Sequence, residues 1–224
     1  MLVPVTAVLN RDQLETVQGV LSRVVFVAGK WSAGSAARRV KHNEEADRGS
    51  VQIGELDQIV MGKLVAHPTY RAAALPLRIA VPYYARYTAG MAYGPHLDDP
   101  IMGTSGALYR ADIAITIFLN EPTEYDGGEL IIQTEFGPQM VKLAAGDAVL
   151  YSASTLHHVN AVTRGQRLVA VTWVQSLIRD PARRALLYDL HHAREVLLAR
   201  DPDAPETVRV GTAYVNLVRM WSEL

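Results

Sequence analysis

The sequence contains no cysteine among its 224 residues. Disulfide bonds and metal sites built from thiolates are therefore excluded. A metal ion bound by this chain would be held by histidine, aspartate, glutamate or backbone oxygen, ligands that suit Fe(II), Mn(II) or Zn(II).

The chain also lacks an excess of charge of one sign and lacks long apolar runs. It has 22 basic and 23 acidic residues, which indicates no nucleic-acid-binding surface. No run approaches the ~20 apolar residues of a membrane helix, and the start, MLVPVTAVLNRDQ, does not have the pattern of a signal peptide. We therefore expect a cytoplasmic protein that binds neither nucleic acid nor membrane.

Helical patterns flank a β-rich centre. Asn10 can cap a helix that begins at the next residue, and a second amphipathic pattern covers about 51–66. The small and charged residues 33–50 predict a solvated loop between these helices. After Asp180, two further patterns of helical spacing predict a C-terminal helical pair.

Short strands are predicted between about residues 77 and 178. The strand-like stretches, separated by turn residues, are 77–87, 111–120, 129–135, 139–145, 146–152 and 167–176. The stretch HHVNAV is expected to form a hairpin with 167–176 around Thr163-Arg164-Gly165. Strands at this spacing indicate a sandwich or a barrel.

These patterns predict a mainly β member of the α+β class, organised in two parts. A domain over 1–178 would have a helical N-terminal part, 1–76, and a β-barrel core, 77–178. Residues 179–224 would form a helical extension, which could pack on the barrel, shape the substrate cleft or make a homo-oligomer contact.

His96 and Asp98 form an H-x-D pair within GPHLDD. On an extended segment, residues i and i+2 face the same side, so an imidazole and a carboxylate can reach one ion. A third ligand from a distant strand would complete the two-histidine, one-carboxylate triad of non-haem Fe(II) oxygenases, which leaves coordination positions open. Alone, an H-x-D pair is more often a loop histidine beside a surface acid than half of a metal site.

The stretch STLHHVNAVTRGQR, residues 154–167, offers the third ligand and a cation. His157 and His158 are neighbours on a strand and point to opposite faces, so the alternation alone leaves open which one faces a site. Arg167 shares a face with Val169 and Val171 that looks like an interior face. A buried guanidinium requires an anion and matches a carboxylate in bidentate fashion, whereas at a strand end it could be solvated.

Taken together, these segments resemble the Fe(II)- and 2-oxoglutarate-dependent dioxygenases, and specifically the bacterial PKHD-type hydroxylases, which are related to prolyl hydroxylases. The matching segments are YTAGMAYGPHLDD (87–99), RADIAITIFLNEP (110–122), EYDGGEL (124–130), VKLAAGDAVLYSASTLHHV (141–159) and VTRGQRLVAVTWVQSLIRD (162–180). The resemblance covers the layout of the whole chain and is densest over 77–180. One small departure is Thr155, where the family often has serine.

The resemblance implies a fold and a set of site residues. The fold would be a double-stranded β-helix, a jelly-roll or cupin-like barrel with the N-terminal helices packed on it. The metal ligands would be His96, Asp98 and His157, which makes His158 incidental. Arg167, and not Arg164, would bind 2-oxoglutarate.

Tyr87 resembles a tyrosine that binds the distal carboxylate of 2-oxoglutarate in related prolyl hydroxylases. A core tyrosine with a satisfied hydroxyl is the alternative interpretation of this residue.

The implied function is hydroxylation of an unidentified substrate, such as a peptidyl prolyl residue, by Fe(II), 2-oxoglutarate and O₂. Succinate and CO₂ would be released, and L-ascorbate would serve as reductant. One alternative is a non-catalytic sensor barrel that binds iron and 2-oxoglutarate. Another is a Zn(II) hydrolase with the same ligands, which would need a general base that the sequence does not identify.

Overall fold

The computed structural model describes all 224 residues. The helices are α1 (Arg11–Leu21), α2 (Gln52–Ala66), α3 (Pro68–Ala74), α4 (Pro181–Arg200) and α5 (Pro205–Trp221), with the 3-10 helices η1 (Gly29–Ser32) and η2 (Ala37–Arg39). The first eight strands are β1 (Leu2–Val5), β2 (Phe26–Ala28), β3 (Lys41–His42), β4 (Glu44–Ala46), β5 (Pro76–Ile79), β6 (Tyr83–Thr88), β7 (Ala92–His96) and β8 (Ile101–Met102). The other eight are β9 (Tyr109–Arg110), β10 (Ile113–Phe118), β11 (Tyr125–Gly127), β12 (Leu130–Thr134), β13 (Gly137–Val141), β14 (Ala148–Ser152), β15 (His157–Val159) and β16 (Val162–Ser176).

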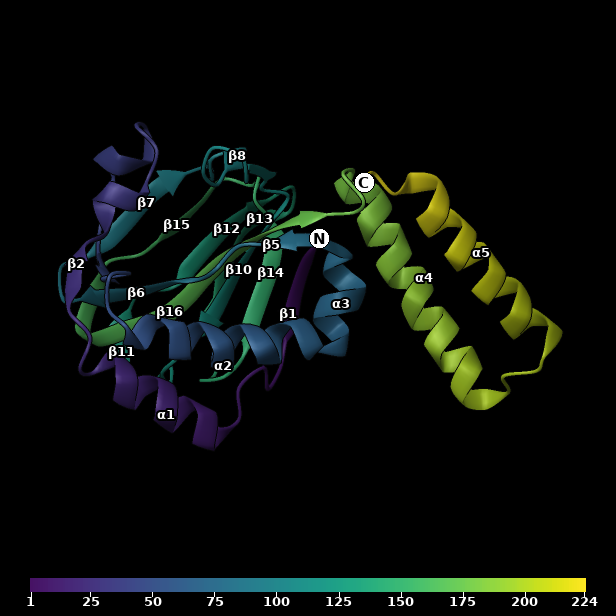
Figure 1. Cartoon of the computed structure of the whole chain (residues 1–224), viewed down its shortest axis with the longest axis horizontal. Helices are drawn as coiled ribbons and strands as arrows, with labels where there is room; N and C mark the ends of the chain where they lie inside the picture. Colours follow the sequence, from purple (N-terminus) through teal and green to yellow (C-terminus); the bar gives the residue numbers. More distant parts are fainter.

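Two antiparallel sheets form the body of the molecule (Figure 1). The major sheet has the order β1-β14-β10-β16-β6-β4-β2, and β5 and β11 also pair with the long strand β16. The minor sheet has the order β13-β12-β15-β7-β3, and β8 pairs only with β9. The predicted α+β architecture with a mainly β core is therefore what the structure shows.

Strand alternation gives the major sheet two apolar faces. On β10, Ile113, Ile115 and Ile117 belong to one buried cluster, whereas Ala114 and Phe118 belong to another. Successive side chains on a strand point to opposite faces. The nearly continuous apolar run that predicted this strand therefore reflects burial on both sides.

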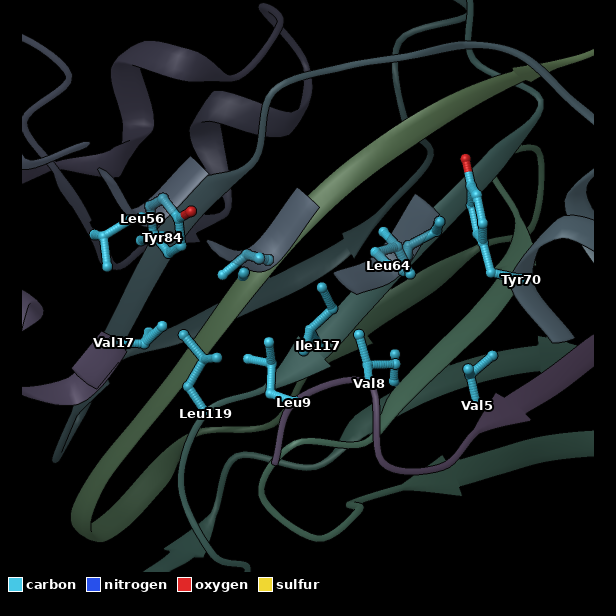
Figure 2. Close-up of a cluster of buried hydrophobic side chains, with 14 of the residues drawn as sticks. Val5, Val8, Leu9, Val17, Leu56, Leu64, Tyr70, Tyr84, Ile117 and Leu119 are labelled. Carbon is cyan, nitrogen blue, oxygen red and sulfur yellow. The ribbon is translucent and has the colours of Figure 1, made fainter. Parts of the chain in front are cut away.

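The outer face of the major sheet is covered by the N-terminal helices (Figure 1). The buried cluster between them is drawn in Figure 2, where Val17 of α1 and Leu56 and Leu64 of α2 face the sheet, and Leu56 lies beside Tyr84 of β6. The helix predicted after Asn10 is present, and its first turn is closed by a reciprocal capping box between Asn10 and Gln13.

Residues 1–76 also supply strands that the sequence did not predict. β1 is an edge strand that pairs only with β14, which explains how it accommodates Pro4. The prediction of a solvated loop over 33–50 was wrong in part, because β3 joins the minor sheet and β4 joins the major sheet. Helix α3 was also missed; it begins at Pro68, and the single residue between it and α2, His67, caps its first turn.

The predicted hairpin around Thr163-Arg164-Gly165 was wrong. β15 pairs with β7 and β12 of the minor sheet, whereas β16 belongs to the major sheet. The three residues of the expected turn lie within β16, where Gly165 faces Tyr125 of β11. The stretch 77–87, predicted as one strand, is divided into β5 and β6.

The C-terminal helices α4 and α5 pack on each other and project from the barrel (Figure 1). Asp180 caps α4, and only Arg184 and Leu187 of that helix are buried. Arg184 fixes the base of the pair by donating to the carbonyl oxygens of Ile178 and Arg179. None of the helices in the structure combines the length and the hydrophobicity that crossing a bilayer requires.

Candidate functional site

A pocket lies between the two sheets and contains every residue that the sequence singled out for the site. It is lined by 24 residues and holds about 750 Å³ of empty space, its open mouth included. The five predicted site residues on its wall are Tyr87, His96, Asp98, His157 and Arg167.

Three of these residues form a cluster with the donor set of a metal site. His96, Asp98 and His157 each offer one ligand atom, and these atoms lie within 4.8 Å of one another. The cluster arises from strand register, because His96 on β7 is directly opposite His157 on β15. Asp98 follows two residues after His96, and its Oδ1 lies 3.8 Å from His157 Nε2.

The structure shows which of the two adjacent histidines faces the pocket. His157 is 4% exposed and lines the pocket, whereas His158 is half-buried, is opposite Ile131 and does not line it. The register of β15 thus settles what alternation along the strand left open.

Backbone carbonyls orient both imidazole rings. Nδ1 of His96 lies 2.8 Å from the carbonyl oxygen of Gly94, and Nδ1 of His157 lies 2.8 Å from that of Thr155. A proton on each Nδ1 leaves Nε2 of each ring as a lone-pair donor to a metal. Since Thr155 acts through its backbone, the replacement of the family's serine leaves this contact intact.

Burial sets the charge state of the cluster. Desolvation, with a smaller repulsion from His157, lowers the pKa of His96 to about 3, so this ring is neutral at neutral pH. Burial raises the pKa of Asp98, against the attraction of His157, and Asp98 Oδ2 is buried without a hydrogen-bond partner. A neutral imidazole and an unsatisfied buried carboxyl oxygen fit a divalent cation such as Fe(II).

Arg167 is a buried cation with no carboxylate beside it. It is 2% exposed, and its Nε has no hydrogen-bond partner. None of the ion pairs in the structure involves it. Its guanidinium carbon lies 5.0 Å from the ring centre of Tyr87 and 5.7 Å from that of Phe118. The alternative of a solvated strand end is therefore wrong, and a buried guanidinium in this state attracts an anion.

Arg164 differs from Arg167 in every one of these respects. It is exposed and forms a bidentate pair with Asp126, with distances of 2.6 and 3.0 Å. The charge of Arg164 is thus already neutralised by Asp126 at the surface.

Tyr87 is the cross-strand neighbour of Arg167 and is 4% exposed. Burial is the main reason why the pKa of Tyr87 rises to about 12, although the nearby Arg167 lowers it. The phenol is therefore protonated at neutral pH and can donate a hydrogen bond into the pocket.

A polar wall of the pocket was missed by the sequence analysis. Lys41 donates to Glu45 Oε1 at 2.5 Å and to Ser32 Oγ at 2.8 Å, and Asn43 lies between the two charged residues. The charged composition of 33–50 indicated solvent exposure, yet the side chains of Lys41 and Glu45 are each only 9% exposed. The sole sequence signal is the i, i+2, i+4 spacing of Lys41, Asn43 and Glu45.

Two family models match the chain. One, described as the 2OG-Fe(II) oxygenase superfamily, covers residues 82–175, and the other, the PKHD-type hydroxylase C-terminal domain, covers 181–223. Among similar curated proteins are PKHD-type hydroxylases from Thioalkalivibrio sulfidiphilus, 47% identical, and from Hyphomonas neptunium, 40% identical. Both matches cover 100% of this chain and 100% of the relative.

Solved structures show a similar fold at low sequence identity. A Pseudomonas putida prolyl-4-hydroxylase has a TM-score of 0.52 at 17% identity, with 78% of this chain and 92% of that chain covered. A Trichoplax adhaerens prolyl hydroxylase, solved with a peptide fragment of hypoxia inducible factor, has a TM-score of 0.55 at 16% identity, covering 83% and 86%. These likenesses confirm the predicted jelly-roll fold.

Proposed function

Because the chain belongs to the PKHD-type hydroxylases of the 2OG-Fe(II) oxygenase superfamily, we propose that it couples substrate hydroxylation to conversion of 2-oxoglutarate into succinate and CO₂. It is a 2-oxoglutarate-dependent hydroxylase with Fe(II) as its metal. One oxygen atom of O₂ would enter the substrate as a hydroxyl group, and the other would enter succinate.

The proposed metal ligands are His96, Asp98 and His157. The single observation that carries this proposal is the convergence of their ligand atoms within 4.8 Å on the pocket wall. The backbone contacts of both imidazoles hold the rings so that Nε2 is free, and three protein ligands leave positions open on an octahedral ion.

The proposed co-substrate contacts are Arg167 and Tyr87. When bound, Fe(II) and 2-oxoglutarate supply the oxidising chemistry, while the chain binds, orients and desolvates the reactants. Arg167 would neutralise the distal carboxylate of 2-oxoglutarate, and the Tyr87 hydroxyl would donate to the same group. Lys41 is the other buried cation in the pocket, but Glu45 already compensates it, which favours Arg167 as the anion site.

For the primary substrate, a peptidyl prolyl or similar residue is proposed from the likeness to prolyl hydroxylases. The Trichoplax structure contains a peptide fragment, and the open mouth of this pocket is compatible with a side chain presented by a longer molecule. L-Ascorbate is proposed as the reductant that restores Fe(II) after turnovers without substrate.

The proposed domain boundary lies near residue 178. All strands precede it, and the two helices that follow make most of their contacts with each other. We therefore propose that 1–178 forms the oxygenase domain and that 179–224 forms a helical extension.

The test is incubation of the purified protein with Fe(II), O₂ and labelled 2-oxoglutarate, with succinate and CO₂ as readouts. We expect both products in equal amounts, and loss of both when Zn(II) replaces Fe(II). A protein that binds Fe(II) and 2-oxoglutarate but forms neither product, even with candidate peptides present, would instead be a sensor.

A further inference from the structure

The extended segment 41–46 crosses from one sheet to the other at the edge of the pocket. Lys41 and His42 pair with β7 of the minor sheet, whereas Glu44 and Glu45 pair with β6 of the major sheet. Asn43 occupies the crossing point between these two sets of pairs.

The Asn43 side chain is buried in the pocket wall with its hydrogen-bonding capacity unused. The residue is 4% exposed, and neither Oδ1 nor Nδ2 has a hydrogen-bond partner. A Cβ atom built on Gly29 would overlap Asn43 Oδ1, so the glycine makes the room that this side chain occupies. A buried amide without partners is destabilising and rare, which indicates a role other than packing.

Strand register places Asn43 beside Tyr87. In the antiparallel pairing of β4 with β6, Glu45 is opposite Ala85 and Glu44 is opposite Arg86. Continuing the same register by one residue puts Asn43 opposite Tyr87, whose neighbour on the other side is Arg167.

Directly opposed residues lie on the same face of a sheet. Asn43, Tyr87 and Arg167 therefore form a row across three neighbouring strands, and all three line the pocket. The amide of Asn43 slightly lowers the pKa of Tyr87, against the larger effect of burial, which agrees with the closeness of the two side chains that the register gives.

We propose that Asn43 is a positioning residue for 2-oxoglutarate, and that, once this ligand is bound, the free Nδ2 group donates to the Tyr87 hydroxyl oxygen. A tyrosine hydroxyl has one proton, and its direction depends on which neighbour occupies the oxygen lone pairs. With Asn43 as the donor on one side, the O–H of Tyr87 points toward the distal carboxylate that Arg167 would bind. This inference rests on the proposed function, since it requires 2-oxoglutarate in that pocket.

The experiment measures binding of two α-keto acids to the Mn(II)-loaded protein by isothermal titration, without turnover. 2-Oxoglutarate has the distal carboxylate, and 2-oxopentanoate chelates a metal in the same way but has a methyl group in its place. For Asn43→Leu, which retains the side-chain volume, the Kd of 2-oxoglutarate should rise about threefold to fivefold, no more than the loss of the Tyr87 hydroxyl itself would cause. The Kd of 2-oxopentanoate should change by less than about twofold, because Tyr87 makes no polar contact with that ligand.

A second variant tests the route through tyrosine. In a Tyr87→Phe background, Asn43→Leu should have no further effect on 2-oxoglutarate binding, because the hydroxyl that it positions is gone. If thermal unfolding shows that the Asn43→Leu variant is not folded, Asn43→Ala replaces it in both binding measurements.

Three results would overturn the inference: an unchanged 2-oxoglutarate Kd, an equal loss for both keto acids, or an undiminished effect in the phenylalanine background. Each requires that the unsubstituted protein binds 2-oxoglutarate. If the unsubstituted protein does not bind it, the proposed function fails first, so the two failures are distinguishable.

Discussion

The two sheets that enclose the pocket contribute opposite kinds of chemistry to it. The minor sheet brings His96 and His157 together, with Asp98 beside them, and leaves a carboxyl oxygen without a partner. The major sheet contributes Tyr87 and Arg167, and leaves a guanidinium without a carboxylate. One sheet thus requires a cation and the other requires an anion.

A metal chelated by a dicarboxylic keto acid satisfies both requirements at once. The metal matches the minor sheet, and the free carboxylate at the other end of the keto acid matches the major sheet. Because the two groups lie on different sheets, substitutions should separate metal binding from keto-acid binding. The predictions below test that separation, beginning with the largest expected effect.

His157→Ala removes a proposed ligand from the minor sheet. We expect metal affinity to fall by more than roughly a hundredfold. Removing only the hydrogen-bond partner of a metal ligand costs up to about that much, and removing the ligand itself should cost more. The measurement is Fe(II) or Mn(II) bound per chain after equilibrium dialysis. His158→Ala is the matched control, since that side chain does not line the pocket; equal losses in both variants would contradict the assignment.

Arg167→Met removes the cation of the major sheet and leaves the metal ligands intact. The lost charge-assisted contact should cost about 2–3 kcal/mol, which raises the 2-oxoglutarate Kd about 30-fold to 150-fold. Metal affinity, measured by dialysis, should stay the same. Arg164→Met should leave both quantities unchanged, because that residue pairs with Asp126 at the surface. An unaltered 2-oxoglutarate Kd in Arg167→Met would show that Arg167 does not bind the co-substrate.

Tyr87→Phe should have the smallest of these effects. Loss of one hydroxyl contact, about 1 kcal/mol, should raise the 2-oxoglutarate Kd about fivefold. Tyr84→Phe is the control on the same strand, because Tyr84 packs under the N-terminal helices, does not line the pocket and donates to Asp57. That change should lower the melting temperature without changing the Kd, whereas a Tyr87→Phe variant that lost only stability would mark Tyr87 as a core residue.

The sequence predicted those features of the site that depend on local spacing. The i, i+2 relation of His96 and Asp98 predicted a shared site, and the structure has it. Alternation gave Arg167 a face that looked interior but left a solvated strand end open, and the structure buries the residue. The choice between His157 and His158 needs the pairing of β15 with β7, and the residues around the two histidines do not reveal which strand will pair with them. The family resemblance chose the histidine that the structure turns into the pocket.

The two wrong predictions, the hairpin and the solvated loop, also arose because strand pairing could not be read from the local sequence. The hairpin was predicted because β15 and β16 are consecutive, but the chain passes from one sheet to the other between them. Residues 33–50 looked like a solvated loop because Lys41 and Glu45 are charged, and their burial makes sense only once the two are paired. Pairing between strands and between charges is long-range information that composition and periodicity do not carry.

A crystal structure of the complex with Mn(II) and 2-oxoglutarate tests the central claim most directly. The account predicts a metal ion bound by His96, Asp98 and His157, and a distal carboxylate within about 3 Å of the Arg167 guanidinium. A distal carboxylate bound at Lys41, or a metal ion held elsewhere in the pocket, would contradict it.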